Sequence, residues 1–137
     1  MKYLFDTNII SYLDKVKYPR LTSKILKKAK KVGNKNIFIS IISCGEILAG
    51  IKSNLKMNED KRQNLIRIIS NAYLLKMQRI TAEIYADVKV MLYEKGVCIC
   101  DNDLWIAAIA LTYNATLVTN DNDFKKIKGL KIENWIR

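Results

Sequence analysis

The stretch that decides the fold lies at the start of the chain and reads Lys2-Tyr3-Leu4-Phe5-Asp6-Thr7-Asn8-Ile9-Ile10. Its apolar run at 3–5 predicts a short buried strand, and the residues at 7–13 predict a short helix. One acid, Asp6, stands at the junction between the two. The same succession of a buried strand, an acid and a helix recurs along the chain, and the rest of the fold is predicted from it.

Three further junctions between buried runs and their neighbours carry acids: Glu46 after the run Ile37–Ile42, Asp101 and Asp103 before the run Leu104–Ala108, and Asp121 and Asp123 after Thr116–Thr119. Ligands of open parallel sheets bind beyond the carboxyl ends of the strands. Asp6 and Asp121 both directly follow predicted strands, so they belong on one edge. We therefore expect the acids of all four junctions to converge on one point of the surface.

Strand-like and helical patterns alternate along the whole chain. Strands are predicted at 2–5, 36–40, 73–77, 116–119 and 130–133, and helices at 7–13, 21–31, 43–53, 58–70, 81–95, 103–113 and 121–126. Gly33-Asn34, Gly96 and Asn114 are predicted breaks. The alternation predicts an α/β fold, in which helices cover both faces of a parallel sheet. The helix over 104–111 is apolar nearly all round and is expected to be buried. The length of 137 residues predicts one domain, 1–137.

Composition narrows the chemistry. The chain contains no histidine, which excludes a Ser-His-Asp triad, a Cys-His pair, a His-based zinc site and a nuclease that uses a histidine pair. Hydrolysis would then rely on carboxylates with a hard cation such as Mg²⁺ or Mn²⁺. No run is long and apolar enough for a membrane span, and no secretory pattern opens the chain. We expect a cytoplasmic protein whose three cysteines are reduced thiols.

Positive charge is concentrated in one part of the chain. The net charge is +11, and no acid occurs between residues 15 and 42. Lys24, Lys27, Lys28 and Lys31 are spaced i, i+3, i+4, i+7 and therefore share one helix face. This face is either a solvated surface, a phosphate-binding flank whose affinity falls with salt, or a contact for an acidic protein.

Helix capping and turns offer a second interpretation of the same acids. Asp6 is a suitable N-cap, Ser43 and Glu46 fit a capping box, Asp101 or Asp103 fits the cap of the following helix, and Asp121 fits a turn. Capping accounts for each acid alone, but it does not require every such junction to be acidic. Clustered carboxylates repel one another, which raises the pKa of at least one of them unless a cation is bound.

Four motifs resemble those of the PIN-domain ribonucleases, especially the VapC-type toxins: Asp6-Thr7-Asn8-Ile9, Ser40 to Gly50 with its single Glu46, Asp103-Leu104-Trp105-Ile106-Ala107-Ala108, and Leu117 to Phe124. They occur in the family's order and cover almost the whole chain. The ending from Gly129 to Trp135 is also similar to the family. The stretch Cys98-Ile99-Cys100 departs from the family pattern.

The resemblance implies a three-layer PIN fold with a five-stranded parallel sheet, and a Mg²⁺- or Mn²⁺-dependent endoribonuclease. It also implies a homodimer neutralised by a cognate antitoxin. The implied metal-binding and catalytic acids are Asp6, Glu46, Asp103 and Asp121, with Thr7, Asn8 and Thr119 as hydrogen-bond partners around them. Asp101 and Asp123 are the less favoured candidates, because Asp103 has the family spacing to Ile-Ala-Ala and Asp121 directly follows the strand.

The implied mechanism is phosphodiester hydrolysis by water at one or two metal ions, leaving a 5′-phosphate and a 3′-hydroxyl. The face of Lys24, Lys27, Lys28 and Lys31 would bind the RNA backbone, with Tyr12 and Tyr18 stacking on bases. One alternative is a non-catalytic PIN-like module that binds RNA or protein and uses its acids as caps. Another is a phosphoaspartyl enzyme or receiver domain on a similar sheet. RNA binding without metal-dependent cleavage would identify the former, and reaction with small phosphoryl donors the latter.

Overall fold

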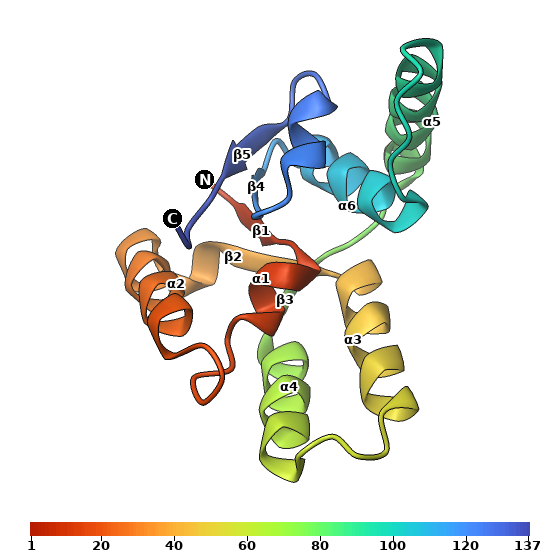
Figure 1. Ribbon diagram of the computed structural model, residues 1–137. Helices are drawn as coiled ribbons and strands as arrows, with labels where there is room; N and C mark the ends of the chain where they lie inside the picture. The colour runs from red at the N-terminus through yellow and green to blue at the C-terminus, as the bar shows by residue number, and fades with distance from the viewer.

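The computed structural model describes residues 1–137 and is built on one five-stranded sheet (Figure 1). The strands are β1 Tyr3–Phe5, β2 Ile37–Ser40, β3 Tyr73–Leu75, β4 Thr116–Val118 and β5 Lys131–Glu133. They lie in the order β3-β2-β1-β4-β5, and every neighbouring pair is parallel. The predicted α/β fold with a parallel sheet is confirmed. Its central strand, β1, comes from the stretch that opens the chain.

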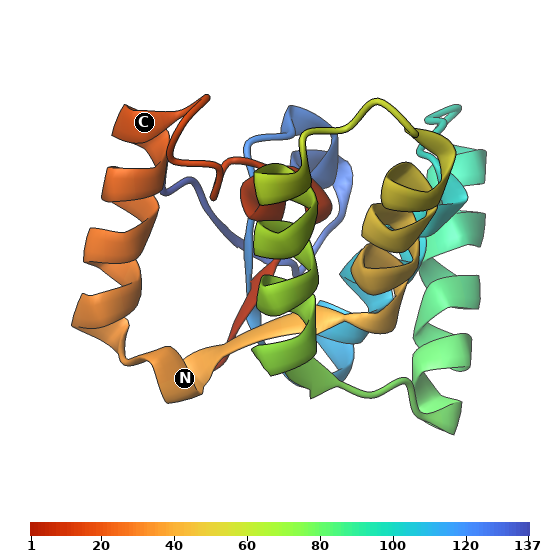
Figure 2. The same cartoon turned by 90° about the horizontal axis from the view of Figure 1, so that it is seen from below.

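Helices cover both faces of the sheet. They are α1 Thr7–Ser11, α2 Pro19–Val32, α3 Ile41–Ser53, α4 Glu59–Asn71, α5 Arg79–Glu94 and α6 Asp101–Thr112, with short 3-10 helices η1 Asn34–Asn36 and η2 Asn122–Lys126. The side chains of α5, α6 and η2 form one core cluster, and those of α1 to α4 form the other. Figures 1 and 2 show the resulting three layers, with α2 set apart from α3 and α5. None of these helices combines the length and apolarity that crossing a lipid bilayer requires.

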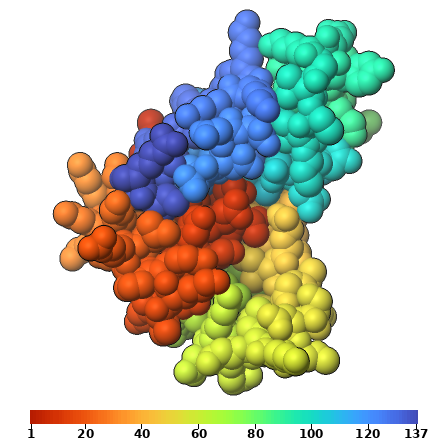
Figure 3. Space-filling model, in the orientation of Figure 1, coloured from red at the N-terminus to blue at the C-terminus, as the bar shows by residue number.

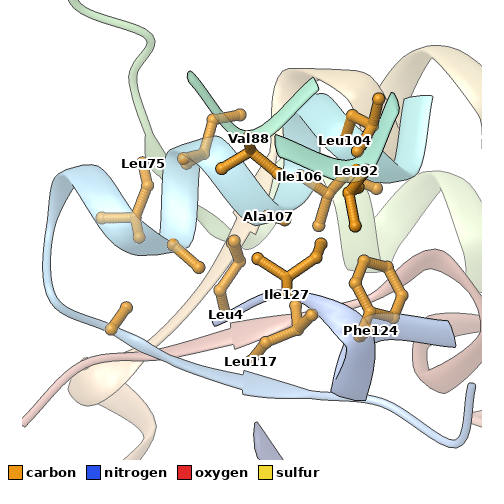
Figure 4. Close-up of a cluster of buried hydrophobic side chains, with 13 residues drawn as sticks. Leu4, Leu75, Val88, Leu92, Leu104, Ile106, Ala107, Leu117, Phe124 and Ile127 are labelled. Carbon is orange, nitrogen blue, oxygen red and sulfur yellow. The ribbon is translucent and has the colours of Figure 1, made fainter. Parts of the chain in front are cut away.

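Alternate residues of each strand point to opposite faces of the sheet and so belong to different core clusters. Leu4 and Leu117 point toward α6, whereas their neighbours Phe5 and Val118 belong to the opposite cluster. Figure 4 shows Leu4, Leu117 and Ile127 beneath the α6 residues Ile106 and Ala107. As predicted, α6 is buried nearly all round, including every residue from Ile106 to Ala110.

Three predicted breaks end helices as expected. Gly33, Gly96 and Asn114 all have positive φ angles, of 91°, 69° and 51°, and they stop α2, α5 and α6. Such angles suit glycine, and asparagine tolerates them better than most residues. All three cysteines are free thiols, as predicted.

Four helices, α2, α3, α5 and α6, begin two residues before their predicted starts, and in α3 and α6 this changes which residue is the cap. The capping box of Ser43 and Glu46 does not form, because α3 begins two residues earlier and Ser40 Oγ accepts the N-cap bond from the Ser43 amide at 3.0 Å. Neither Asp101 nor Asp103 is the cap of α6. Both lie within its first turn after Cys100, whose side chain makes no capping bond. The side chains of Glu46 and Asp103 therefore do not cap the helices α3 and α6.

Candidate active site at the carboxyl edge of the sheet

Asp6 occupies the centre of the site, where β1 passes into α1. Its backbone amide donates to Val118 O at 3.0 Å, which continues the pairing of β1 with β4 by one residue. Its side chain is only 3% exposed. One carboxylate oxygen accepts from the Thr7 amide and the other from Thr119 Oγ1, both at 2.8 Å. Burial raises the pKa of Asp6, the two hydrogen bonds partly oppose that effect, and nearby Asp121 and Glu46 raise the pKa further.

A chain of hydroxyl groups fixes Glu46. Thr7 Oγ1 donates to Glu46 Oε1 at 2.8 Å and lies 2.8 Å from Ser43 Oγ, which in turn accepts from Ser40 Oγ at 3.3 Å. Each hydroxyl has one proton to donate. Since Thr7 gives its proton to Glu46, Ser43 must donate to Thr7, and all donations run in one direction toward the carboxylate. This chain holds α1 and α3 in register at the site.

Thr119 connects the other side of the cluster. Its hydroxyl donates to Asp6 and accepts from the Asp121 amide at 3.0 Å, and the side chain is 2% exposed. Asp121 is the N-cap of η2, where its Oδ1 accepts from the Asp123 amide at 2.9 Å. Its second oxygen makes no hydrogen bond within the chain. The capping interpretation therefore holds for Asp121, although it uses only half of the carboxylate.

Asp103 faces this group from the first turn of α6. It is half-buried and makes no side-chain hydrogen bond within the chain. Burial first, and then the charges of Asp6, Asp121, Glu46 and Asp123, raise the pKa of Asp103 to about 6. All four predicted acids thus lie close enough to act on one another electrostatically, although they come from four distant parts of the sequence.

The four acids are brought together without forming a closed ligand set. As the side chains stand, no group of three acids is close enough to hold one metal ion. Figure 3 shows α1 at the centre of one face, with the C-terminal segments on one side and α3 on the other. The site is therefore a carboxylate cluster in which Asp6 is buried and Glu46, Asp103 and Asp121 are partly exposed.

A small hollow adjoins Glu46. It has a volume of about 190 Å³, with Thr7, Glu46 and Lys61 on its polar side and an apolar wall of Ile47, Met57 and Leu65. The Lys61 ammonium makes no ion pair within the chain. A wider hollow, of about 560 Å³, lies between α5 and the loop before α6, and its lining includes none of the four acids. We therefore assign the chemistry to the carboxylate cluster rather than to the wider hollow.

Comparison with known proteins fixes the family. Residues 3–130 match the PIN domain family. The chain belongs to the PIN-domain family. Its curated relatives are named VapC ribonucleases: it is 35% identical to Ribonuclease VapC2 of Rickettsia felis, with 98% of each chain covered. It is 29% identical to Ribonuclease VapC2 of Haemophilus influenzae strain Rd, with 99% of each covered. The predicted resemblance is confirmed.

Solved structures agree with this PIN-domain assignment. VapBC2 from Rickettsia felis, solved bound to a DNA fragment from its promoter, is 33% identical with a TM-score of 0.81, covering 98% of this chain and 99% of that one. VapBC-1 from nontypeable Haemophilus influenzae is 28% identical with a TM-score of 0.84 over the full length of both chains. The shared architecture therefore extends over essentially the whole chain.

Three other predicted residues of this PIN domain have different surroundings. Asp101 is exposed and accepts from Tyr85 Oη at 2.8 Å and Lys89 Nζ at 3.0 Å, contacts that lower its pKa. It is therefore engaged with α5 and does not contribute to the cluster. Asp123 pairs with Lys126 at 2.9 Å, although its charge still reaches Asp103. Asn8 is exposed, and its side chain makes none of the expected hydrogen bonds.

Sequence reasoning missed part of this site. It assigned Ser43 to a cap and gave no role to Ser40 or Lys61. The spacing of three residues from Ser40 to Ser43 and again to Glu46 was an available signal, because it puts all three on one side of α3. Lys61 had no such signal, since α4 reaches the site only through tertiary packing.

Proposed function

We propose that this chain is a Mg²⁺- or Mn²⁺-dependent endoribonuclease of the cytoplasm and the toxin of a toxin–antitoxin pair. The observation that carries the proposal is the convergence of four acids, Asp6, Glu46, Asp103 and Asp121, which are so close that burial and the charges of the other three raise the pKa of Asp103 to about 6. A cluster that repels itself in this way is poorly suited to a capping role alone. It is well suited to a divalent cation and to a phosphodiester substrate.

The donor set fits a hard divalent cation. All four acids offer only oxygen ligands, which Mg²⁺ and Mn²⁺ prefer. Asp6 and Asp103 are the proposed direct ligands, because one sits at the centre of the cluster and the other has no partner within the chain. Glu46 and Asp121 complete the set directly or through water. When bound, the cation would neutralise phosphate charge and lower the pKa of a coordinated water.

The remaining residues position these groups. Thr119 orients Asp6, and its contact with the Asp121 amide couples β4 to η2. The hydroxyl chain that ends at Thr7 holds one oxygen of Glu46, and we propose that the other oxygen orients the attacking water. Lys61 faces the same hollow as Glu46. Its ammonium is the cation best placed to hold a phosphate next to the one that is cut.

The test is cleavage of a labelled pool of structured RNAs by wild type, Asp103→Asn and Asp101→Asn, each with Mg²⁺ or with chelator. Asp101 is a matched control, because it lies two residues away on the same helix but binds Tyr85 and Lys89. We expect discrete cuts by wild type and Asp101→Asn only with metal, and none by Asp103→Asn. Tight RNA binding without cutting would instead favour the non-catalytic module. Equal cutting by all three proteins would refute the assigned site.

Two partners belong to the proposal. The solved relatives carry the name VapBC, and a more distant one, 21% identical, is described as a member of the VapBC family of toxin-antitoxin systems. We propose that a cognate antitoxin binds this chain. We also propose a homodimer, which is supported by Ile41 and Leu48 of α3, spaced i, i+7 and exposed by 53% and 39%. Sedimentation of wild type and Ile41→Lys tests the dimer.

A further inference from the structure

The face of α2 that points away from the core forms a continuous basic surface. It is made by Lys24, Lys27, Lys28 and Lys31, together with Arg137 from the end of the chain, and we call it the α2 basic surface. These five side chains and Trp135 line a hollow of about 280 Å³. Figure 1 shows the C-terminal segment beside α2, which explains how Arg137 joins the lysines. Lys24 Nζ also donates to Ile136 O at 3.4 Å, which fixes this end of the hollow.

No ion pair balances this charge. The chain's three ion pairs are Arg62 with Glu59, Lys89 with Asp101 and Lys126 with Asp123, and none involves the α2 basic surface. Residues 15–42 contain no acid at all. Residues four apart on a helix are separated by about 6 Å along the axis, so the lysines form a regular array about 10 Å long. Five cations around one hollow form a surface that is complementary to a polyanion.

The hollow is connected to the site through Trp135. The Trp135 ring packs edge-on against Phe5 with centroids 5.3 Å apart, and Phe5 directly precedes Asp6. Trp135 also follows β5, so this residue lies near the same edge of the sheet as the carboxylates. The α2 basic surface and the site are therefore joined by two packed residues, Phe5 and Trp135.

We propose that the α2 basic surface binds the phosphate backbone of single-stranded RNA outside the cleavage site, independently of base sequence. This inference rests on the proposed function, because it takes RNA as the substrate. An acidic protein segment is the less favoured ligand, because protein interfaces have an apolar core. The only apolar residue lining this hollow, Trp135, is 2% exposed. For the same reason no aromatic ring is available there to stack on bases, and affinity must come from charge.

The experiment measures binding of a fluorescent 20-nucleotide oligouridylate to Asp103→Asn protein in chelator, at 50 and 200 mM salt. The experiment measures binding without cutting. The proposal for the α2 basic surface can therefore be refuted while the proposed nuclease function holds, and the nuclease function can be refuted while the binding proposal holds. The test variant changes Lys24, Lys27, Lys28 and Lys31 to Gln. The control variant changes four exposed lysines elsewhere to Gln, which removes the same amount of charge: Lys52, Lys56, Lys95 and Lys128.

Each phosphate contact on a single strand contributes a slope of about 0.7 to the dependence of log affinity on log salt. Removal of four lysine–phosphate pairs should reduce the slope by about 2.8, so that over this range of salt the affinity of the test variant falls about 50-fold less than that of its parent. The control variant should keep most of the parental slope. Equal slopes in test and control variants would overturn the proposal. So would loss of binding to polyglutamate by the test variant with RNA binding unchanged, which would assign the surface to an acidic protein.

Discussion

Replacing Asp103 with Asn should make the metal-free protein more stable. The carboxylate makes no hydrogen bond within the chain, so the substitution removes charge repulsion without removing a contact. Its pKa rises from 3.8 to about 6, and each pKa unit corresponds to about 1.4 kcal/mol. The full shift would be worth about 3 kcal/mol. Because Asp103 is partly exposed and water screens its charge, we expect a gain of about 1–2 kcal/mol at pH 8.

The difference in stability between Asp103→Asn and wild type should depend on pH. The folded state holds the Asp103 proton up to a higher pH than the unfolded state does, so wild type loses stability as pH rises from about 4 to 6. The asparagine of the variant has no proton to lose in this range, so the gap between variant and wild type should widen over the same range and then stay constant. For a gain of about 1–2 kcal/mol, the gap at pH 4.5 should be roughly half to two-thirds of its value at pH 8.

Urea unfolding in chelator at pH 4.5 and pH 8 measures both quantities. Asp101→Asn serves as the control, because the pKa of Asp101 is lowered by Tyr85 and Lys89, and its replacement should not stabilise the protein. With Mg²⁺ at 100 times its Kd, wild type should gain about 2.7 kcal/mol, whereas Asp103→Asn should gain less. A variant that is no more stable than wild type at pH 8, or a gap that does not change with pH, would refute the reasoning.

Thr7→Val should lower cleavage at least roughly 10-fold, because Glu46 loses its hydrogen-bond donor, whereas Thr7→Ser should retain activity; single-turnover cleavage of RNA measures both. Gly50→Ala should raise the free energy of unfolding by about 1 kcal/mol, because Gly50 is within α3 and nothing lies within 4 Å of an added Cβ; urea unfolding that shows a decrease would contradict the open space there. Leu117→Ala should cost about 2–5 kcal/mol, because Leu117 is fully buried beneath α6, and a cost below about 1 kcal/mol would mean that the core collapses around the cavity.

The sequence was most informative where local pattern and burial agree. Short apolar runs predicted β1 and β4, and the all-round apolar pattern predicted the buried α6. The acids at the junctions then followed from the rule that parallel strands present their carboxyl ends at one edge.

Local pattern was least informative where two conformations compete. Ile41 and Ile42 are β-branched and extend the apolar pattern of β2, but they begin α3 because Ser40 caps it. The contacts of Asp101 could not be predicted either, because its partners Tyr85 and Lys89 lie 16 and 12 residues away on α5. Neither helix propensity nor spacing within one helix reports such a contact. The position of Lys61 beside Glu46 could not be predicted for the same reason, because the two residues belong to different helices.

The order of strands in the sheet has a consequence for synthesis of the protein. β1 is made first, but one of its two neighbours, β4, comes from residues 116–118. Until those residues are translated, one side of β1 has no partner strand, and Thr119 and Asp121 do not exist to meet Asp6. A nascent chain that stops after α5 carries two of the four acids and no α6. The carboxylate cluster is thus assembled only after β4 and Asp121 have been translated.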